Sequence, residues 1–257
     1  MVIAEIEILK LFLLVFARFG GLMVSAPVLG SQNFPAIAKI GLAGLAALII
    51  TPTLPALPGP LPAEAMPFAV IGAEEFLIGL LVGFVMGLVF AAIQLGGQIM
   101  DMQTGFGMMN VFNPAMETQF PIFGFLLFIL GVMYLLVIQG HHLMIRALIA
   151  TYEHVPIGGI PTDADLYFKL ASMGSLIFVD GIMLAAPVAT AMLLAYLTMG
   201  LLGRVVPQIQ LFVVGFPVTI ATGLIVIAFA MGVYIEILDG MFYRSFGAVE
   251  QLIKAMG

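Results

Sequence analysis

Side chains that could do chemistry are few in this sequence, and none has the spacing of a catalytic or metal site. His141 and His142 are adjacent, so they cannot share one helix face as the histidines of an HExxH zinc motif do. Glu74 and Glu75 are neighbours rather than a matched acid–base pair. There is no cysteine, no GxSxG motif and no P-loop. The sequence therefore points away from an enzyme, a metal site or a bound cofactor.

Three polar residues lie on one side of an otherwise apolar stretch. Gln94, Gln98 and Asp101 are spaced i, i+4 and i+7, which places them on one face of a helix. Polar groups on an apolar helix are costly unless they have partners, so we expect this face to meet other polar groups or a water-filled path. Emergence of the helix into water is the alternative interpretation.

The same stretch continues into an uncharged segment in which glycine and Asn-Pro disfavour a continuous helix. In a membrane protein, irregular backbone is tolerated only where protein or a cavity satisfies it. Phenylalanine and methionine side chains that repack easily would suit a deformable apolar stopper, and glycines would let it swing aside. The segment consists of Gly105, Phe106, Gly107, Met108, Met109, Asn110, Val111, Phe112, Asn113 and Pro114.

The elements that must position these residues are predicted from composition to be membrane helices. Of 257 residues, 63% are hydrophobic and 9% are charged, against roughly 45–50% and about 25% in a soluble domain. So little charge cannot cover a water-facing surface, so lipid or a large partner surface must cover the exterior. The net charge is −6 and lysine and arginine are not clustered, which excludes a nucleic-acid partner.

A membrane-spanning helix needs about 20 apolar residues. About six stretches qualify, at residues 9–29, 36–57, 66–100, 120–145, 171–203 and 205–238. The first follows an acidic start, unlike a signal peptide, and is expected to remain as a membrane helix. The sequence thus predicts an all-α integral membrane protein with broken helices and hairpins. No repeat or linker divides residues 1–257, which are expected to form a single domain.

Proline, glycine and polar residues predict the breaks between these stretches. Residues 30–35 predict a tight connection, residues 52–67 carry six prolines and predict an extended segment, and residues 151–165 predict an exposed loop. Bends are expected near Pro207 and Pro217, within a region that also contains Gln208 and Gly215. Arg204 is expected either to anchor the helix at the membrane interface or to pair with a buried acid such as Asp180.

Small residues recur every four positions in the third stretch. Gly79, Gly83 and Gly87 make a smooth helix face that another backbone can approach closely. The partner backbone is either another helix of this chain or another subunit.

Four segments, taken in order, resemble the FliR-like family of membrane components of the flagellar type III export apparatus. They are FARFGGLMVSAPVLGSQNFP, which contains Arg18, then QLGGQIMDMQTGFGMMNVFNP, QGHHLMIRALIATYEHVPIG and GLLGRVVPQIQLFVVGFPVTI. The likeness covers nearly the whole chain. The virulence-type SctT proteins are similar, and an export gate of that type is the close alternative.

The resemblance implies a fold in which a FliP-like part is joined to a FliQ-like part. It implies assembly with FliP and FliQ homologues, cooperation with an FlhB homologue, and passage of unfolded flagellar subunits through the centre of the assembly. The expected location is the bacterial inner membrane, in the flagellar basal body and in contact with lipid. The family's plug loop matches residues 105–114, with Phe106 and Phe112 as pore-sealing residues.

A different class of function also fits some of these features. An ion-coupled secondary transporter would use broken helices and intramembrane acids, and this sequence has Asp101, Asp180 and Asp239. Its halves, however, do not repeat a pattern of interrupted helices.

Overall fold

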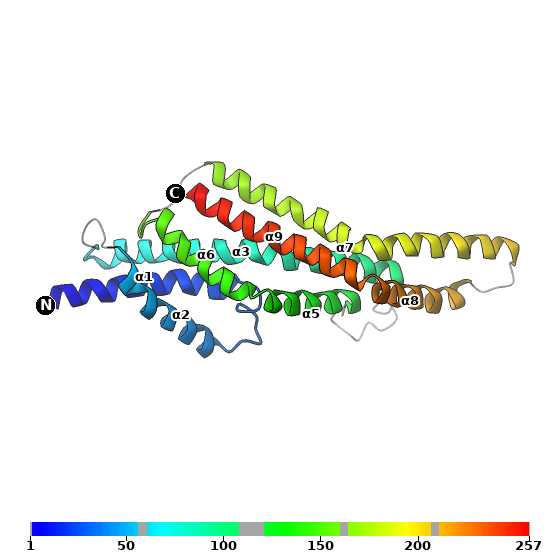
Figure 1. The fold of residues 1–257 in the computed structure, drawn as a ribbon, viewed down its shortest axis with the longest axis horizontal. Helices are drawn as coiled ribbons and strands as arrows, with labels where there is room; N and C mark the ends of the chain where they lie inside the picture. The colour runs from blue at the N-terminus through cyan, green and yellow to red at the C-terminus, as the bar shows by residue number, and fades with distance from the viewer. Residues whose placement is uncertain (1, 56–60, 108–120, 160–163, 207–210, 257) are drawn as a thin grey trace. The chain divides into compact units, whose positions relative to one another are not determined.

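The structure is a computed structural model that describes residues 2–55, 61–107, 121–159, 164–206 and 211–256. Across those ranges it contains helices and no strand, which confirms the all-α prediction. In chain order, shown in Figure 1, the elements are α1 (Val2–Ser25), α2 (Ala36–Ile50), the 3₁₀ helix η1 (Thr51–Thr53), α3 (Ala65–Thr104), α5 (Ile122–Val137), α6 (Gly140–His154), α7 (Ala164–Val205), α8 (Leu211–Phe229) and α9 (Met231–Met256).

The number of membrane-capable segments agrees with the sequence. Within the described ranges, four helices are long and apolar enough to cross a membrane: α1, α2 together with η1 (Ala36–Thr53), α3 and α7. Two further pairs, α5 with α6 and α8 with α9, pass the same test together, and each pair is bent by 65°. Counting each bent pair as one span gives six, as the sequence predicted, and broken helices are present, although these two bends do not lie near Pro207 or Pro217.

The chain divides into two compact units, each assembled from separated segments. Unit 1 contains Met1–Leu88, Gln139–Met173 and Arg244–Gly257, and unit 2 contains Val89–Ile138 and Gly174–Tyr243. Helices α3, α7 and α9 each contribute residues to both units. The expectation of a single domain over residues 1–257 stays a prediction.

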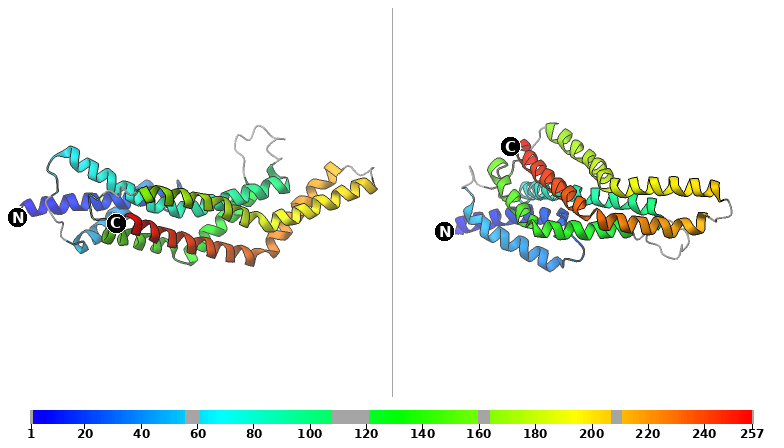
Figure 2. Two further views of the ribbon diagram at one scale, coloured as in Figure 1. Left: turned by 90° about the horizontal axis from the view of Figure 1, so that it is seen from above. Right: turned by 45° about the vertical axis from the view of Figure 1, so that its right-hand side comes forward.

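In unit 1, α1 packs against α2 as a helical hairpin, and the two helices lie side by side in Figure 2. The connection runs over residues 26–35, so it is longer than the predicted 30–35. It is held by hydrogen bonds, because the Gly30 N–H donates to the Ala26 carbonyl at 2.7 Å and the Lys39 ammonium donates to the Gly30 carbonyl at 2.9 Å. The apolar core of unit 1 draws on α1, α2, α3, α6 and α9, through side chains such as Phe19, Ala47 and Val82.

Two expectations about loops are wrong. Residues 151–154 belong to α6 rather than to an exposed loop. Thr151 and Tyr152 are buried, because both side chains contact the buried Arg18. Pro67 lies in the first turn of α3 rather than in an extended segment. A proline is tolerated there because the first backbone N–H groups of a helix have no intrahelical acceptor.

The bends near residue 217 also differ from expectation. Helix α8 continues through Pro217, and the 65° bend follows it, between Phe229 and Met231. Pro217 is the seventh residue of α8, so it lacks the N–H that would bond the Val213 carbonyl, yet the helix continues beyond it. Helix α7 ends at Val205, as a proline at 207 requires, but Pro207 and Gln208 themselves lie outside the described residues.

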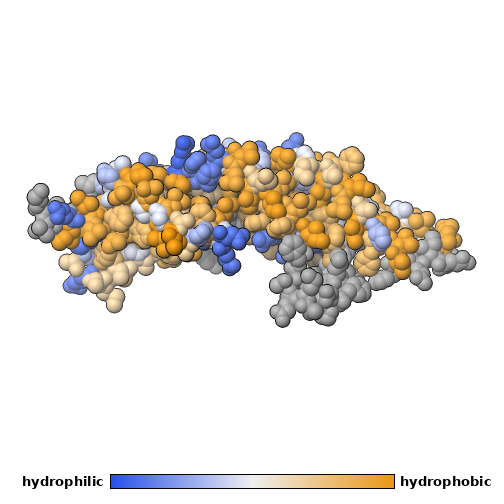
Figure 3. Space-filling view, turned by 90° about the horizontal axis from the view of Figure 1, so that it is seen from below, coloured by the Kyte–Doolittle hydropathy of each residue, from blue (hydrophilic) through white to orange (hydrophobic). Residues whose placement is uncertain are grey.

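The surface is apolar over much of the chain. Figure 3 shows one face, on which hydrophobic residues predominate. Large side chains such as Ile37, Leu201 and Phe229 are 85%, 66% and 88% exposed. Water would solvate such a surface poorly, so lipid or partner subunits must cover it.

Candidate functional site

A buried ion pair holds three segments of unit 1 together. Arg18 on α1 and Glu75 on α3 are both fully buried, and the arginine Nε donates to Glu75 Oε2 at 2.6 Å. A second donor, Nη2, reaches Glu75 Oε1 at 3.1 Å, so the pair is bidentate. Nη1 donates to the hydroxyl of Thr151 on α6 at 2.8 Å.

The remaining contacts of this pair come from the end of α6 and the loop after it. Arg18 Nη2 also donates to the Val155 carbonyl at 3.3 Å, and the Gly158 N–H donates to Glu75 Oε1 at 3.2 Å. The guanidinium carbon lies 4.0 Å from the centroid of the Tyr152 ring, in a cation–π contact. Each donor named here bonds either Glu75 or an oxygen atom of Thr151 or Val155. The cluster is therefore a structural clamp rather than a reactive site.

Sequence reasoning named Arg18 only as a family-motif residue and missed Glu75 as its partner. The signal was present, because an acid inside an apolar helix requires a nearby donor. This signal does not say which donor is the partner, because Arg18 lies 57 positions from Glu75 and 133 positions from Thr151.

The glycine row of α3 packs against α1 within unit 1. A Cβ at Gly79 would overlap the carbonyl oxygen of Arg18, and one at Gly83 would overlap the Ser25 hydroxyl. At Gly87 the nearest atom is the Ser25 carbonyl oxygen at 3.8 Å, which is ordinary contact. The structure thus places Gly79 and Gly83 against a backbone of the same chain.

In unit 2, Asp101 caps the start of α5. The residue is 4% exposed, and its carboxylate accepts hydrogen bonds from the backbone N–H groups of Phe123 at 3.0 Å and Gly124 at 3.1 Å. The residue at the N-cap position of α5 is Pro121, which makes no side-chain capping bond. Asp101 therefore supplies from α3 the oxygen atoms that α5 lacks at its own N-terminus.

Helix α8 packs against the same end of α3. The Thr219 hydroxyl donates to the Thr104 carbonyl at 2.8 Å. Gly105 adopts a positive φ of 92°, as the glycine-rich sequence predicted for a break, and an added Cβ would lie 2.9 Å from the Phe216 ring. The Phe106 ring stacks edge-on against Phe123, with centroids 5.4 Å apart.

These contacts define what we call the α3–α5–α8 junction, made of described residues only: Asp101, Thr104, Gly105, Phe106, Phe123, Gly124, Phe216 and Thr219. The segment predicted to act as a stopper starts at this junction. Gly107 is also described, whereas Met108, Met109, Asn110, Val111, Phe112, Asn113 and Pro114 lie outside the described residues.

The polar face predicted on α3 separates into two environments. Asp101 is buried in the junction, whereas Gln94 and Gln98 are exposed and line a cavity of about 310 Å³ together with Gly124, Phe125 and other residues at the start of α5. The three side chains share a helix face, but only the carboxylate reaches the first backbone N–H groups of α5.

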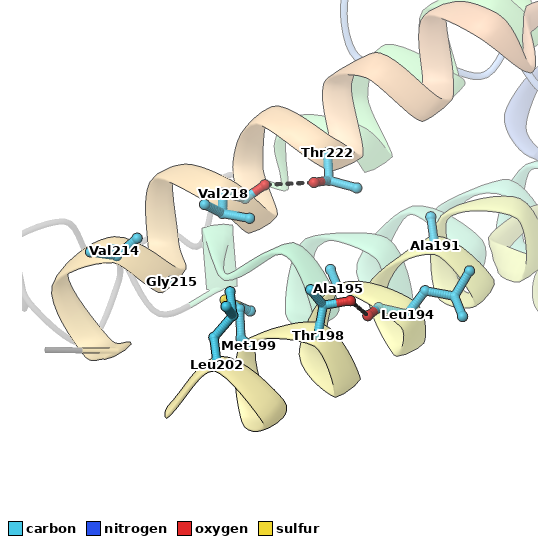
Figure 4. Close-up of a pocket in the computed structure, with 10 residues that line it drawn as sticks. All are labelled: Ala191, Leu194, Ala195, Thr198, Met199, Leu202, Val214, Gly215, Val218 and Thr222. Carbon is cyan, nitrogen blue, oxygen red and sulfur yellow. Dashed lines mark hydrogen bonds between the residues drawn. The ribbon is translucent and has the colours of Figure 1, made fainter. Parts of the chain in front are cut away.

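A second, larger groove runs between the end of α7 and the start of α8. Figure 4 shows that its two threonines are satisfied within their own helices, because Thr198 bonds the Leu194 carbonyl and Thr222 the Val218 carbonyl. The groove, of about 460 Å³, is therefore apolar in character. Its lining includes Gly215 but not the neighbouring Pro217.

Arg204 is exposed near the end of α7, and it does not pair with Asp180. Both residues lie on α7, 24 positions apart, which corresponds to about 36 Å along a helix. The alternative of the ion pair is therefore wrong, and the interfacial anchor stays a prediction.

The histidines form no metal site in the part of the chain that the structure describes. His141 and His142 lie at the start of α6 with ring centroids 4.2 Å apart, and Nδ1 of His141 is buried without a hydrogen-bond partner. Among the described residues, no three His, Cys, Asp or Glu side chains are grouped to hold a metal ion.

The fold and these clusters define an all-helical membrane protein whose buried polar groups hold helices to one another. The chain belongs to the bacterial export proteins, family 1, and the family matches residues 9–245.

Three relatives are similar over nearly their whole length, and each carries the name flagellar biosynthetic protein FliR. The protein from Escherichia coli (strain K12) is 32% identical over 96% of this chain and 94% of its own length. The one from Bacillus subtilis (strain 168) is 28% identical over 98% of both chains. The one from Pectobacterium carotovorum subsp. carotovorum is 31% identical over 94% of this chain and 92% of its own length.

Proposed function

We propose that this chain is a structural component of the flagellar type III protein export gate in the bacterial inner membrane. With homologues of FliP and FliQ it forms a gated pore for unfolded flagellar subunits, and an FlhB homologue cooperates with the assembly. Family membership and the flagellar name of the relatives support this proposal. So does the amount of large apolar surface that the chain leaves exposed.

One observation carries the mechanism. The uncharged segment 105–114 begins at the α3–α5–α8 junction, where helices α3, α5 and α8 are bonded to one another around its first residues. A stopper needs a fixed base if it is to close a pore in a defined position. The junction supplies such a base for Gly105 and Phe106.

The proposed action is passive. An apolar constriction made by Phe106, Met108, Met109 and Phe112 excludes water and ions by dewetting, without bond chemistry. Opening requires these side chains to move aside for an unfolded chain. The energy is supplied elsewhere in the apparatus, since the sequence has no P-loop to bind a nucleotide.

Co-expression with FliP and FliQ homologues tests the proposal. The complex is extracted in mild detergent through a tag on this chain, and its native mass is determined. We expect one stable particle that contains both partners. A well-behaved monomer or homodimer, recovered while both partners are expressed, would contradict the proposal and favour the secondary transporter.

A further inference from the structure

Building on the proposed function, we infer that Asp101 is a positioning residue for the seal. Its carboxylate fixes the first turn of α5, and through Phe123 that turn holds the ring of Phe106 in place. Asp101 does not itself contact the exported chain in this inference. It acts by determining where Phe106 rests.

The first link from Asp101 to the seal is the pair of hydrogen bonds between α3 and α5. The two oxygens of Asp101 accept one N–H each, from Phe123 and Gly124, at 3.0 and 3.1 Å. These are charge-assisted bonds to a helix N-terminus, where an anion is also favoured by the helix dipole. Because Asp101 is 4% exposed, little water is available to replace its carboxylate.

The second step is how closely α5 fits against α3 at this point. A Cβ on Gly97 would overlap the Cα of Gly124, and the Gly124 backbone lies close enough that its own added Cβ would be 3.7 Å from Asp101 Oδ2. The two backbones are therefore almost in contact one turn before Asp101. The carboxylate then sets the position of the α5 terminus about this contact.

The third step links that terminus to the seal. Phe123 is fully buried, and its N–H bonds Asp101. Its ring contacts the Phe106 ring edge to face, with centroids 5.4 Å apart. Phe123 also borders α8, because a Cβ at Gly223 would lie 3.1 Å from its ring and 2.6 Å from the Thr104 methyl. A shift of Phe123 therefore changes the surface on which Phe106 rests.

The experiment uses the complete complex, reconstituted in liposomes, with passive ion leak and native mass measured on each sample. Asp101→Asn keeps the size of the side chain but replaces one acceptor oxygen by an NH₂ group, which faces a backbone N–H. We expect an assembled complex of unchanged mass whose leak rises about tenfold, because one lost charge-assisted hydrogen bond shifts a two-state equilibrium by about that factor.

The matched control is Gln98→Ala, on the same predicted polar face but outside the junction. Its leak is expected to equal that of the unaltered complex. Equal leak from Asp101→Asn and the unaltered complex would overturn the inference, as would equal increases from Asp101→Asn and Gln98→Ala. If the complex forms and Phe106→Ala leaks, either result contradicts only this inference and leaves the proposed function standing.

A second variant decides the matter if Asp101→Asn does not assemble. Phe123→Leu keeps the backbone N–H that Asp101 holds but removes the ring that contacts Phe106. A raised leak in the assembled Phe123→Leu complex would support the positioning role, and an unchanged leak would overturn it. Failure of the unaltered chain to form the complex, or a tight seal in Phe106→Ala, would contradict the proposed function itself.

Discussion

At the scale of single residues, the buried charges of this chain act on the backbone and on each other. Arg18 is fully buried yet makes four hydrogen bonds, two of them to Glu75. Asp101 is buried on the first N–H groups of α5. Charged groups persist in an apolar interior only when their hydrogen-bonding capacity is used in this way. Both clusters are therefore read as structural.

Glu75→Gln should destabilise the chain strongly. The change leaves the Arg18 guanidinium buried without a counter-charge, and breaking one partner of a buried pair costs about 3–5 kcal/mol. Thermal unfolding in detergent, followed by far-ultraviolet circular dichroism, measures the loss. Glu74→Gln is the matched control, because the carboxylate of Glu74 is not part of the clamp. Equal unfolding temperatures for Glu75→Gln and the unaltered chain would contradict the role of the pair.

Removing both charges should cost less than removing one. In a double variant Arg18→Met, Glu75→Leu, no uncompensated charge stays in the core, and apolar replacements of buried pairs are often neutral. The double variant is expected to unfold above the temperature of Glu75→Gln in the same measurement. An unfolding temperature below that of the single variant would mean that the side-chain shapes, rather than the charges, dominate the clamp.

At the scale of elements, the close approach of helices depends on glycine at particular points. Helix α3 meets α1 at Gly79 and Gly83, and it meets α5 at Gly97. A methyl group at any of these three positions would overlap an atom of the neighbouring segment. Gly96 has the same role toward α7, because an added Cβ would lie 2.8 Å from the Gly181 carbonyl oxygen, whereas Gly87 has room for a side chain.

Gly79→Ala should separate α3 from α1. The added methyl group overlaps the Arg18 carbonyl oxygen, which is backbone and cannot rotate away, so overpacking is expected to cost about 1–3 kcal/mol. The unfolding temperature in detergent measures the effect. Gly87→Ala changes the same row of the same helix, but the nearest atom is 3.8 Å away, so its unfolding temperature should be unchanged or raised. Equal destabilisation by both variants would contradict the packing role of Gly79.

At the scale of the whole molecule, the segments that carry the family resemblance meet in pairs. Arg18 from the first segment bonds Thr151 and Val155 from the third, within unit 1. Thr104 from the second bonds Thr219 from the fourth, within unit 2. Each unit thus has a polar cluster built from two of the four segments. The polar residues of these segments therefore have a role in packing that does not depend on the exported protein.

The assembled gate should leak when its seal is removed. Replacement of both Phe106 and Phe112 by alanine shortens two apolar side chains of the proposed stopper, so water and ions are expected to enter the pore. Passive ion conductance of the complex in planar bilayers measures this effect. An assembled variant with unchanged conductance would show that the plug lies elsewhere. Phe125→Ala, outside segment 105–114, is the control for loss of a large aromatic side chain.

The sequence by itself determined the class of protein and most of its breaks. Long apolar runs and scarce charge predict membrane helices because hydrophobicity is a property of a local stretch. Gly105 and Pro207 predict helix ends because their backbone restrictions are local as well, and α3 ends at Thr104 and α7 at Val205. The same reasoning failed at Pro217, where α8 continues past the proline and the bend follows only after Phe229.

Only the tertiary structure decided which polar groups meet. Arg18 and Thr151 are 133 positions apart, and the local sequence around one does not identify the other as its partner. Gln94, Gln98 and Asp101 look equivalent by helical spacing, yet only Asp101 reaches the terminus of α5. The physical reason is that helix periodicity defines a face of one element, whereas hydrogen-bond partners depend on which elements pack there and at what distance.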